Sequence, residues 1–177
     1  MVMTMDVLWP DTLPARVEPD GHEDERHSLD GWIAYHRATL LMKCQGLTSE
    51  QLKLRSAAPS SLTLLGLVRH MTEVERGWFR IHAAKEQLDF PYSTTENPEA
   101  DIFDVDGADA SADIALFVAE CELAQAAMEG IELDVVITRN ERWFDVRWIY
   151  LHMIEEYARH NGHADLLREL IDGATGD

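Results

Sequence analysis

Basic residues are scarce in this chain. Fifteen lysines and arginines stand against 33 aspartates and glutamates, which gives a formal net charge of −18. A surface of this charge repels phosphate backbones and anionic lipids, so neither nucleic acid nor a membrane surface is an expected partner. Cysteine is nearly absent as well. Cys44 and Cys121 lie in separate apolar segments and belong to no CxxC pair, a usage typical of a reducing cytoplasm.

Long hydrophobic runs are also missing. The first 19 residues lack the basic start and apolar stretch of an export signal, and no segment approaches the roughly 20 apolar residues that cross a bilayer. We therefore expect a protein that is not exported and does not span a membrane. The chain contains no HExxH segment, so it gives no support to a metalloprotease with that arrangement.

The 177 residues are enough for one packed domain. Prolines at positions 10, 14 and 19 predict an extended arm over residues 1–22, followed by a domain over residues 23–173. Apolar residues recur at three- and four-residue steps in four later segments, which predicts four long helices. The first is expected to begin between residues 23 and 28 and to end near residue 46, and the others to cover about 62–86, 110–128 and 145–173.

The connections between these helices are unequal. Residues 48–59 predict at most a short helix, and residues 131–144 are extended or irregular. Residues 88–109 form a long acidic connection, either a lid over a site or a solvated loop. The expected fold is all-α, a four-helix bundle with at least one long crossover connection.

The last predicted helix carries an unusual set of polar side chains. His152, Glu156, His160 and His163 fall within an arc of about 80° at 100° per residue, on the side that also holds Ile149, Met153, Leu167 and Leu170. Burying such groups without partners is costly, and a metal ion would compensate them. The competing interpretation is a partly exposed helix with solvated histidines.

A second helix offers another donor. His70 lies within the apolar stripe of the segment 62–86. Two imidazoles and one carboxylate would leave coordination positions open, as in catalytic zinc sites, although the same donors accept iron, nickel or manganese. His152 and His163 are each a further ligand, a residue that orients a ligand, or an acid or base. His36 has the same open roles as His152 and His163. The remaining histidines, at positions 22, 27 and 82, are expected at the surface.

Three segments resemble one known family. LDGWIAYHRATLLMKCQGLT from Leu29, HMTEVERGWF from His70 and HMIEEYARHNGHADLLRE from His152 are similar to the DinB/YfiT-like superfamily of metal-binding four-helix bundles. The resemblance covers about residues 23–172. It is closest to an actinobacterial branch of unknown function related to mycothiol-dependent enzymes such as maleylpyruvate isomerase.

The resemblance implies specific site residues. The family's metal triad corresponds here to His70, Glu156 and His160, and many relatives have histidine where this chain has Glu156. His163 and His152 are then candidate catalytic residues. The resemblance also implies an up-down-down-up bundle and a homodimer, with a low-molecular-weight thiol such as mycothiol as cofactor.

The function expected from these features is metal-dependent thiol S-transfer or isomerisation. A divalent ion, zinc first among the choices, would lower the pKa of the thiol so that a thiolate attacks an electrophilic substrate. Arg139, Arg142 and Arg147 could bind a carboxylated or glycosylated cofactor, or only balance an acidic surface. The alternatives are a metal-dependent hydrolase with a water nucleophile and a non-enzymatic stress protein with a structural ion.

Overall fold

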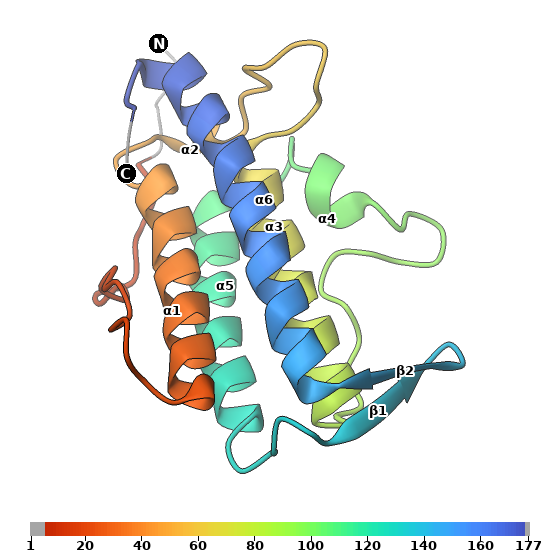
Figure 1. Ribbon diagram of the computed structural model, residues 1–177. Helices are drawn as coiled ribbons and strands as arrows, with labels where there is room; N and C mark the ends of the chain where they lie inside the picture. Colours follow the sequence, from red (N-terminus) through yellow and green to blue (C-terminus); the bar gives the residue numbers. More distant parts are fainter. Residues whose placement is uncertain (1–5, 176–177) are drawn as a thin grey trace, which may run out of the picture.

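The structure is a computed structural model that describes residues 6–175, so the first five residues of the predicted arm lie outside the described residues. The chain is mostly helical, with one small two-stranded sheet. Four long helical segments lie side by side (Figure 1): α1 (Glu25–Cys44), α3 (Leu64–Glu75) with its continuation η1 (Arg76–Ala83), α5 (Ala110–Ala127) and α6 (Val146–Asp172). In Figure 1, α1 and α6 run in one direction, and α3 and α5 run in the other.

The helix ends follow local chemistry. Asp24 caps α1 and Asp145 caps α6, each accepting a hydrogen bond from the backbone N–H three residues later. Gly173 ends α6 with φ 79°, a left-handed conformation that favours glycine. These bounds confirm the first, third and fourth predicted helices to within a few residues. The predicted short helix after residue 48 is α2 (Ser49–Leu52), closed by a capping box from Thr48 and Gln51.

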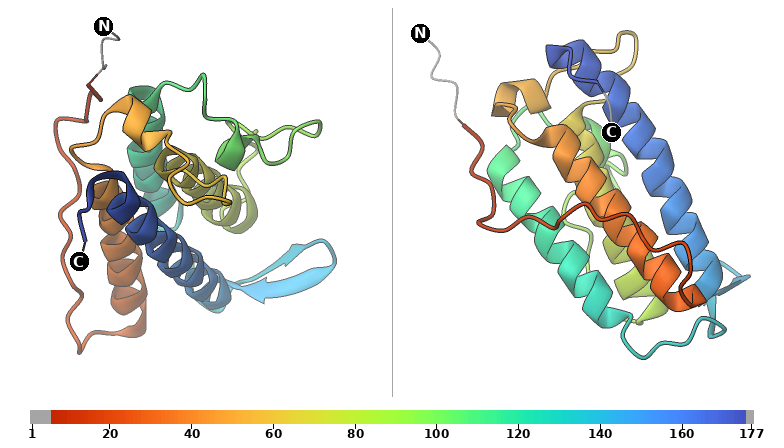
Figure 2. Two further views of the ribbon diagram at one scale, coloured as in Figure 1. Left: turned by 90° about the horizontal axis from the view of Figure 1, so that it is seen from above. Right: turned by 60° about the vertical axis from the view of Figure 1, so that its left-hand side comes forward.

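One long helix differs from the expectation, and one connection resolves an open alternative. The second long helix turns into a π-helix at Arg76 and ends at Ala83 instead of near residue 86. Residues 131–145 contain a hairpin of β1 (Val136–Arg139) and β2 (Arg142–Asp145), which agrees with the extended alternative and adds a small sheet to the mostly helical structure. The hairpin projects beyond the helices, as the left view of Figure 2 shows.

The core lies between the four long helical segments. Leu40, Leu67, Phe117 and Tyr157, one from each segment, are at most 2% exposed, as expected for the apolar stripes. One residue assigned to the inner side of α6 is misplaced: Leu170 is 58% exposed, in the last turn of that helix. Within residues 6–175, no helix has the length and apolar character needed to cross a membrane.

A buried polar network crosses this core. The guanidinium of Arg37 on α1 donates two hydrogen bonds of 2.7 Å to the carboxylate of Glu75 on α3. The hydroxyl of Tyr157 on α6 donates to the same carboxylate at 2.5 Å. Glu75 is fully buried, so this pairing is what makes its charge tolerable, and it fixes α1, α3 and α6 relative to one another.

The long acidic connection packs against α3 at both ends of an exposed stretch, residues 94–99. Glu73 accepts hydrogen bonds from the backbone N–H groups of Tyr92 and Ser93. Further along, the connection forms the short helix α4 (Ala100–Phe103), which lies beside α3. Gly66 permits this close approach, because a Cβ there would lie 2.2 Å from the carbonyl oxygen of Ile102.

Candidate metal centre

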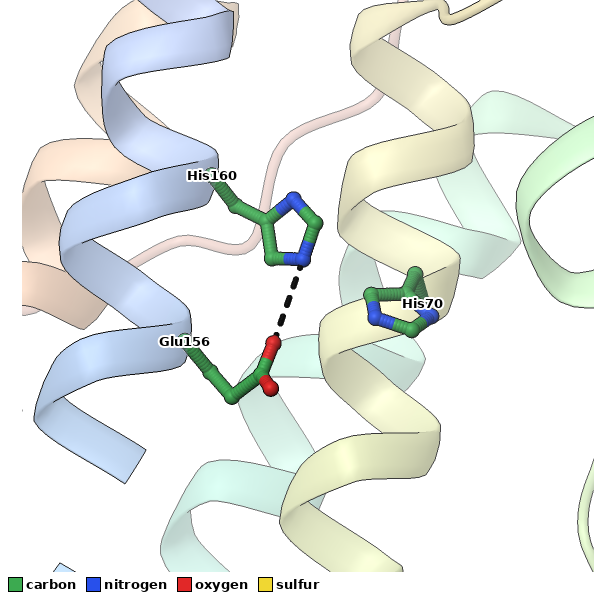
Figure 3. Close-up of side chains that lie close together, drawn as sticks. All are labelled: His70, Glu156 and His160. Carbon is green, nitrogen blue, oxygen red and sulfur yellow. Dashed lines mark ion pairs between the residues drawn. The ribbon is translucent and has the colours of Figure 1, made fainter. Parts of the chain in front are cut away.

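Three of the predicted site residues come together between α3 and α6. His70 on α3, and Glu156 and His160 on α6, each offer a ligand atom, and these atoms all lie within 4.8 Å of one another. Figure 3 shows the two α6 side chains reaching toward the imidazole of His70. The four-residue step on α6 places Glu156 and His160 one turn apart on the same face, with Nε2 of His160 3.3 Å from Oε2 of Glu156.

The triad is partly enclosed. His160 is 8% exposed, so the solvated-histidine alternative is wrong for this residue, while His70 and Glu156 are partly buried. Burial and the neighbouring imidazoles of His70 and His163 lower the pKa of His160 from its ordinary 6.5 to about 4. His160 is therefore neutral at physiological pH, which is the form of imidazole that binds metal ions.

The outer nitrogens of both histidines have partners. Nδ1 of His70 lies 2.7 Å from Oδ2 of Asp101, and Nδ1 of His160 lies 3.4 Å from Nδ1 of His163. Burial is the largest single influence on Asp101 and opposes its ionisation, but the hydrogen bond and the charge of His70, together with the backbone N–H of Ile102, lower the pKa of that carboxyl overall. Nδ1–H of His70 thus donates to a carboxylate, which leaves Nε2 as the free donor atom, a common arrangement behind metal-binding histidines.

The donor set fits a divalent metal ion. Two imidazole nitrogens and one carboxylate oxygen are ligands that zinc accepts, and three protein ligands leave at least one position for another group. Metal centres of this kind also commonly have a carboxylate that contacts a ligand imidazole, as Asp101 contacts His70 here. The residues present therefore fit the expected ion.

The remaining candidates lie around this triad. His163 contacts His160 as described. His152 has Nε2 3.6 Å from Oε1 of Glu156, and its ring stacks on Trp148 and meets Trp78 edge-on. His36 lies outside the triad, stacks on Tyr157 and receives a hydrogen bond from Asn161 on its carbonyl oxygen. His22 and His27 are exposed as expected, whereas His82 is partly buried.

A cavity of about 850 Å³ adjoins the triad at His70. One wall is the helical segment α3–η1, with Trp78 and His82, and the opposite wall is the connection 88–101. Arg139 on the hairpin also lines the cavity. The connection that the sequence left as a lid or a solvated loop is thus a wall of this cavity, with room for a small molecule beside His70.

Protein-family comparison matches residues 28–173 to the family described as mycothiol-S-transferase. The chain belongs to the mycothiol S-transferase family. The match includes both helices that carry the triad, and it agrees with the resemblance to the DinB/YfiT-like superfamily found in the sequence. Among curated proteins, no relative matches the chain. Membership of this family points to a small-molecule thiol as the cofactor or substrate.

Two features of the centre were not found from the sequence. Asp101 is one of six carboxylates between positions 96 and 109, and nothing in its spacing separates it from the others. The π-helical segment η1 was read as a regular α-helix, because the apolar positions of residues 64–81 fit a period of 3.6 residues. The role of Asp101 depends on how the connection packs on α3.

Proposed function

We propose that this protein is a metal-dependent thiol S-transferase that uses a low-molecular-weight thiol such as mycothiol. The observation that carries the proposal is the convergence of His70, Glu156 and His160 beside a large cavity, in a chain of the mycothiol S-transferase family. A bound divalent ion, most simply zinc, would lower the pKa of a coordinating thiol and so supply a thiolate nucleophile.

The chain's own residues then have distinct tasks. His70, Glu156 and His160 would hold the ion, with Asp101 and His163 orienting the two imidazoles from behind. The cavity would hold the electrophilic substrate next to His70. His152, between Trp78 and Trp148 and near Glu156, is the proposed group for proton transfer.

Glu156 sets this site apart from three-histidine relatives. A His, Glu, His triad with neutral imidazoles carries one negative charge before the ion binds, which favours retention of a divalent cation. We infer that the four long helices form the DinB/YfiT-like up-down-down-up bundle, as a domain over residues 23–173. The homodimer and the cytoplasmic location stay predictions.

The test combines metal content with thiol dependence. Untagged protein should contain about one zinc, nickel, iron or manganese ion per chain by mass spectrometry, and His70→Ala/His160→Ala should contain almost none. His22→Ala/His27→Ala is the matched control, because it removes two exposed imidazoles. Turnover of an electrophile such as monochlorobimane should require mycothiol in the wild type and be lost in the first variant.

Each alternative predicts a different result. A metal-dependent hydrolase would turn over esters or amides without thiol and would not conjugate monochlorobimane. A structural ion would be retained in the wild type, with neither thiol conjugation nor hydrolysis. Absence of metal even after reconstitution with excess ion would contradict the proposal.

A further inference from the structure

The three arginines near the start of α6 have different surroundings. Arg147 forms an ion pair with Glu25, at 2.5 Å between Nε and Oε1. Arg142 lies over the ring of Phe144, with its guanidinium carbon 5.2 Å from the centroid. Arg139 lies over the ring of Trp78 at 4.7 Å and lines the cavity beside the metal centre. Of the three, only Arg139 both lines the cavity and has no ion-pair partner among the described residues.

Arg139 lacks a carboxylate partner among residues 6–175, although the chain carries 33 acidic residues. Its cross-strand neighbour is Arg142, directly opposite in the antiparallel hairpin. Like charges in this position are unfavourable. The two guanidinium groups therefore face each other across the hairpin, and no ion pair joins either of them to Glu141 in the turn between them.

The neighbouring groups at this end of the cavity are also cationic or neutral. His82 lines the cavity and meets the Trp78 ring edge-on at 5.5 Å. Burial lowers the pKa of His82, and the positive charges of Arg139 and Lys85 lower it further. His82 therefore lies beside two cationic side chains at this end of the cavity.

The carboxylates of the cavity lie on α3 and along the connection. Glu73 is held by backbone N–H groups of the connection, and Asp101 is held by His70. Asp89 and Glu96 are exposed at its rim. The cavity thus has Arg139 at the hairpin end and His70 of the candidate metal centre at the other. Trp78, which lies under Arg139, is about two helical turns or roughly 12 Å along the helix from His70.

We propose that Arg139 is a specificity-determining residue that binds the carboxylate of an electrophilic organic acid. This inference rests on the proposed transferase function and names its substrate class. The guanidinium would hold the carboxylate at the hairpin end, and the electrophilic carbon would then point along the cavity toward His70. Arginine suits this task because its planar guanidinium donates two parallel hydrogen bonds to a carboxylate.

The test uses 4-chloro-3,5-dinitrobenzoate and its neutral amide as electrophiles with mycothiol. In the reaction the thiolate sulfur forms a C–S bond, the C–Cl bond breaks, chloride leaves with the bonding electrons, and the thiol proton passes to buffer. Arg139→Gln should raise KM for the acid about tenfold, the loss of one charge-assisted contact. Its KM for the amide and for mycothiol should stay within about twofold of the wild-type values.

Arg142→Gln is the matched control, since it removes the same charge from the opposite strand position and lies outside the cavity lining. It should raise KM for the acid by no more than about threefold, through the long-range field alone. Equal effects of the two substitutions, or equal effects of Arg139→Gln on acid and amide, would overturn the inference. So would a rise confined to the KM for mycothiol.

A binding measurement separates this inference from the transferase proposal. The nitrobenzoate is titrated against the metal-loaded protein without thiol, with quenching of tryptophan fluorescence as the readout. Neither cysteine competes as a nucleophile, because Cys44 and Cys121 are buried. Binding that weakens about tenfold in Arg139→Gln without any turnover would support the anion site and overturn the transferase. Turnover in the wild type, with binding of the nitrobenzoate unchanged in Arg139→Gln, would support the transferase and overturn the anion site.

Discussion

Nδ1 of His70 on α3 lies 2.7 Å from Oδ2 of Asp101 on α4. This contact joins the long acidic connection to the candidate metal centre. Asp101 is 6% exposed, so its carboxylate is removed from water and committed to the imidazole. The connection therefore has two roles: it forms a wall of the cavity, and it supplies the group that orients one proposed ligand.

Removal of Asp101 should weaken metal binding while the fold persists. We expect Asp101→Ala to lower the metal affinity by about 10- to 100-fold, because Nδ1–H of His70 loses its acceptor. Asp101→Asn keeps an acceptor oxygen, so its metal affinity should lie between those of the wild type and Asp101→Ala. Competition with a chromogenic chelator gives the dissociation constants. Asp104→Ala is the control, since Asp104 is exposed in the same connection; an equal loss there would contradict the assignment.

Gly66 should be required for the approach of α4 to α3. In Gly66→Ala the new Cβ would lie 2.2 Å from the carbonyl oxygen of Ile102, so α4 must move and carry Asp101 with it. We expect a loss of about 1–3 kcal/mol in the free energy of unfolding, together with weaker metal binding. Chemical denaturation and the same chelator competition measure both.

The control for this substitution is Gly162→Ala in α6, where the added Cβ meets nothing within 4 Å. Alanine should stabilise that helix by up to about 1 kcal/mol. If Gly66→Ala retained both full stability and full metal affinity, the close approach of the two helices would not be needed.

Glu75 should be a major determinant of stability. Glu75→Gln leaves the buried guanidinium of Arg37 without a counter-charge, so we expect a loss of about 3–5 kcal/mol in the free energy of unfolding. The double variant Arg37→Met/Glu75→Leu removes both charges and should regain most of that loss. Urea denaturation of the metal-free protein measures this without interference from the ion.

An exposed ion pair provides the comparison. Arg159 and Glu155 lie one turn apart on the surface of α6, at 3.2 Å. Glu155→Gln should change the free energy of unfolding by less than about 0.5 kcal/mol. A similar effect of the two glutamine substitutions would contradict the importance given to the buried pair.

Metal removal should lower the thermal midpoint of unfolding only when the triad is intact. An ion at 100 times its dissociation constant stabilises the folded state by about 2.7 kcal/mol. Calorimetry of the wild type with and without a chelator should show this shift. His70→Ala/His160→Ala should unfold at the same temperature in both conditions, and a chelator effect of wild-type size there would place the ion elsewhere.

The sequence predicted most of the helices and a set of candidate ligands, because both depend on local spacing, and the family resemblance selected the triad from that set. His152, Glu156, His160 and His163 share one face of a helix through their three- and four-residue steps, whatever the rest of the chain does. The facing donor His70 was found in the same way, from its place in an apolar stripe. The structure brings His70, Glu156 and His160 together, and their role as ligands remains a proposal.

What the sequence did not reveal depends on tertiary contacts. The role of Asp101 follows from the packing of α4 on Gly66, a contact 36 residues apart along the chain that leaves no periodic signal. The sequence also did not distinguish the role of Arg139 from those of Arg142 and Arg147, because this depends on the hairpin register and on the position of Trp78. The exposure of Leu170 shows the same limit, because helical rotation alone does not tell where the neighbouring helices end.

The most direct test of the central claim is the visible absorption spectrum of cobalt-substituted protein titrated with mycothiol. If His70, Glu156 and His160 hold an ion with an open position, thiol addition should produce a sulfur-to-cobalt charge-transfer band that saturates at one thiol per chain. His70→Ala/His160→Ala should show no such band. Cobalt that binds tightly at the triad but keeps an unchanged spectrum at saturating thiol would contradict the proposed thiol activation.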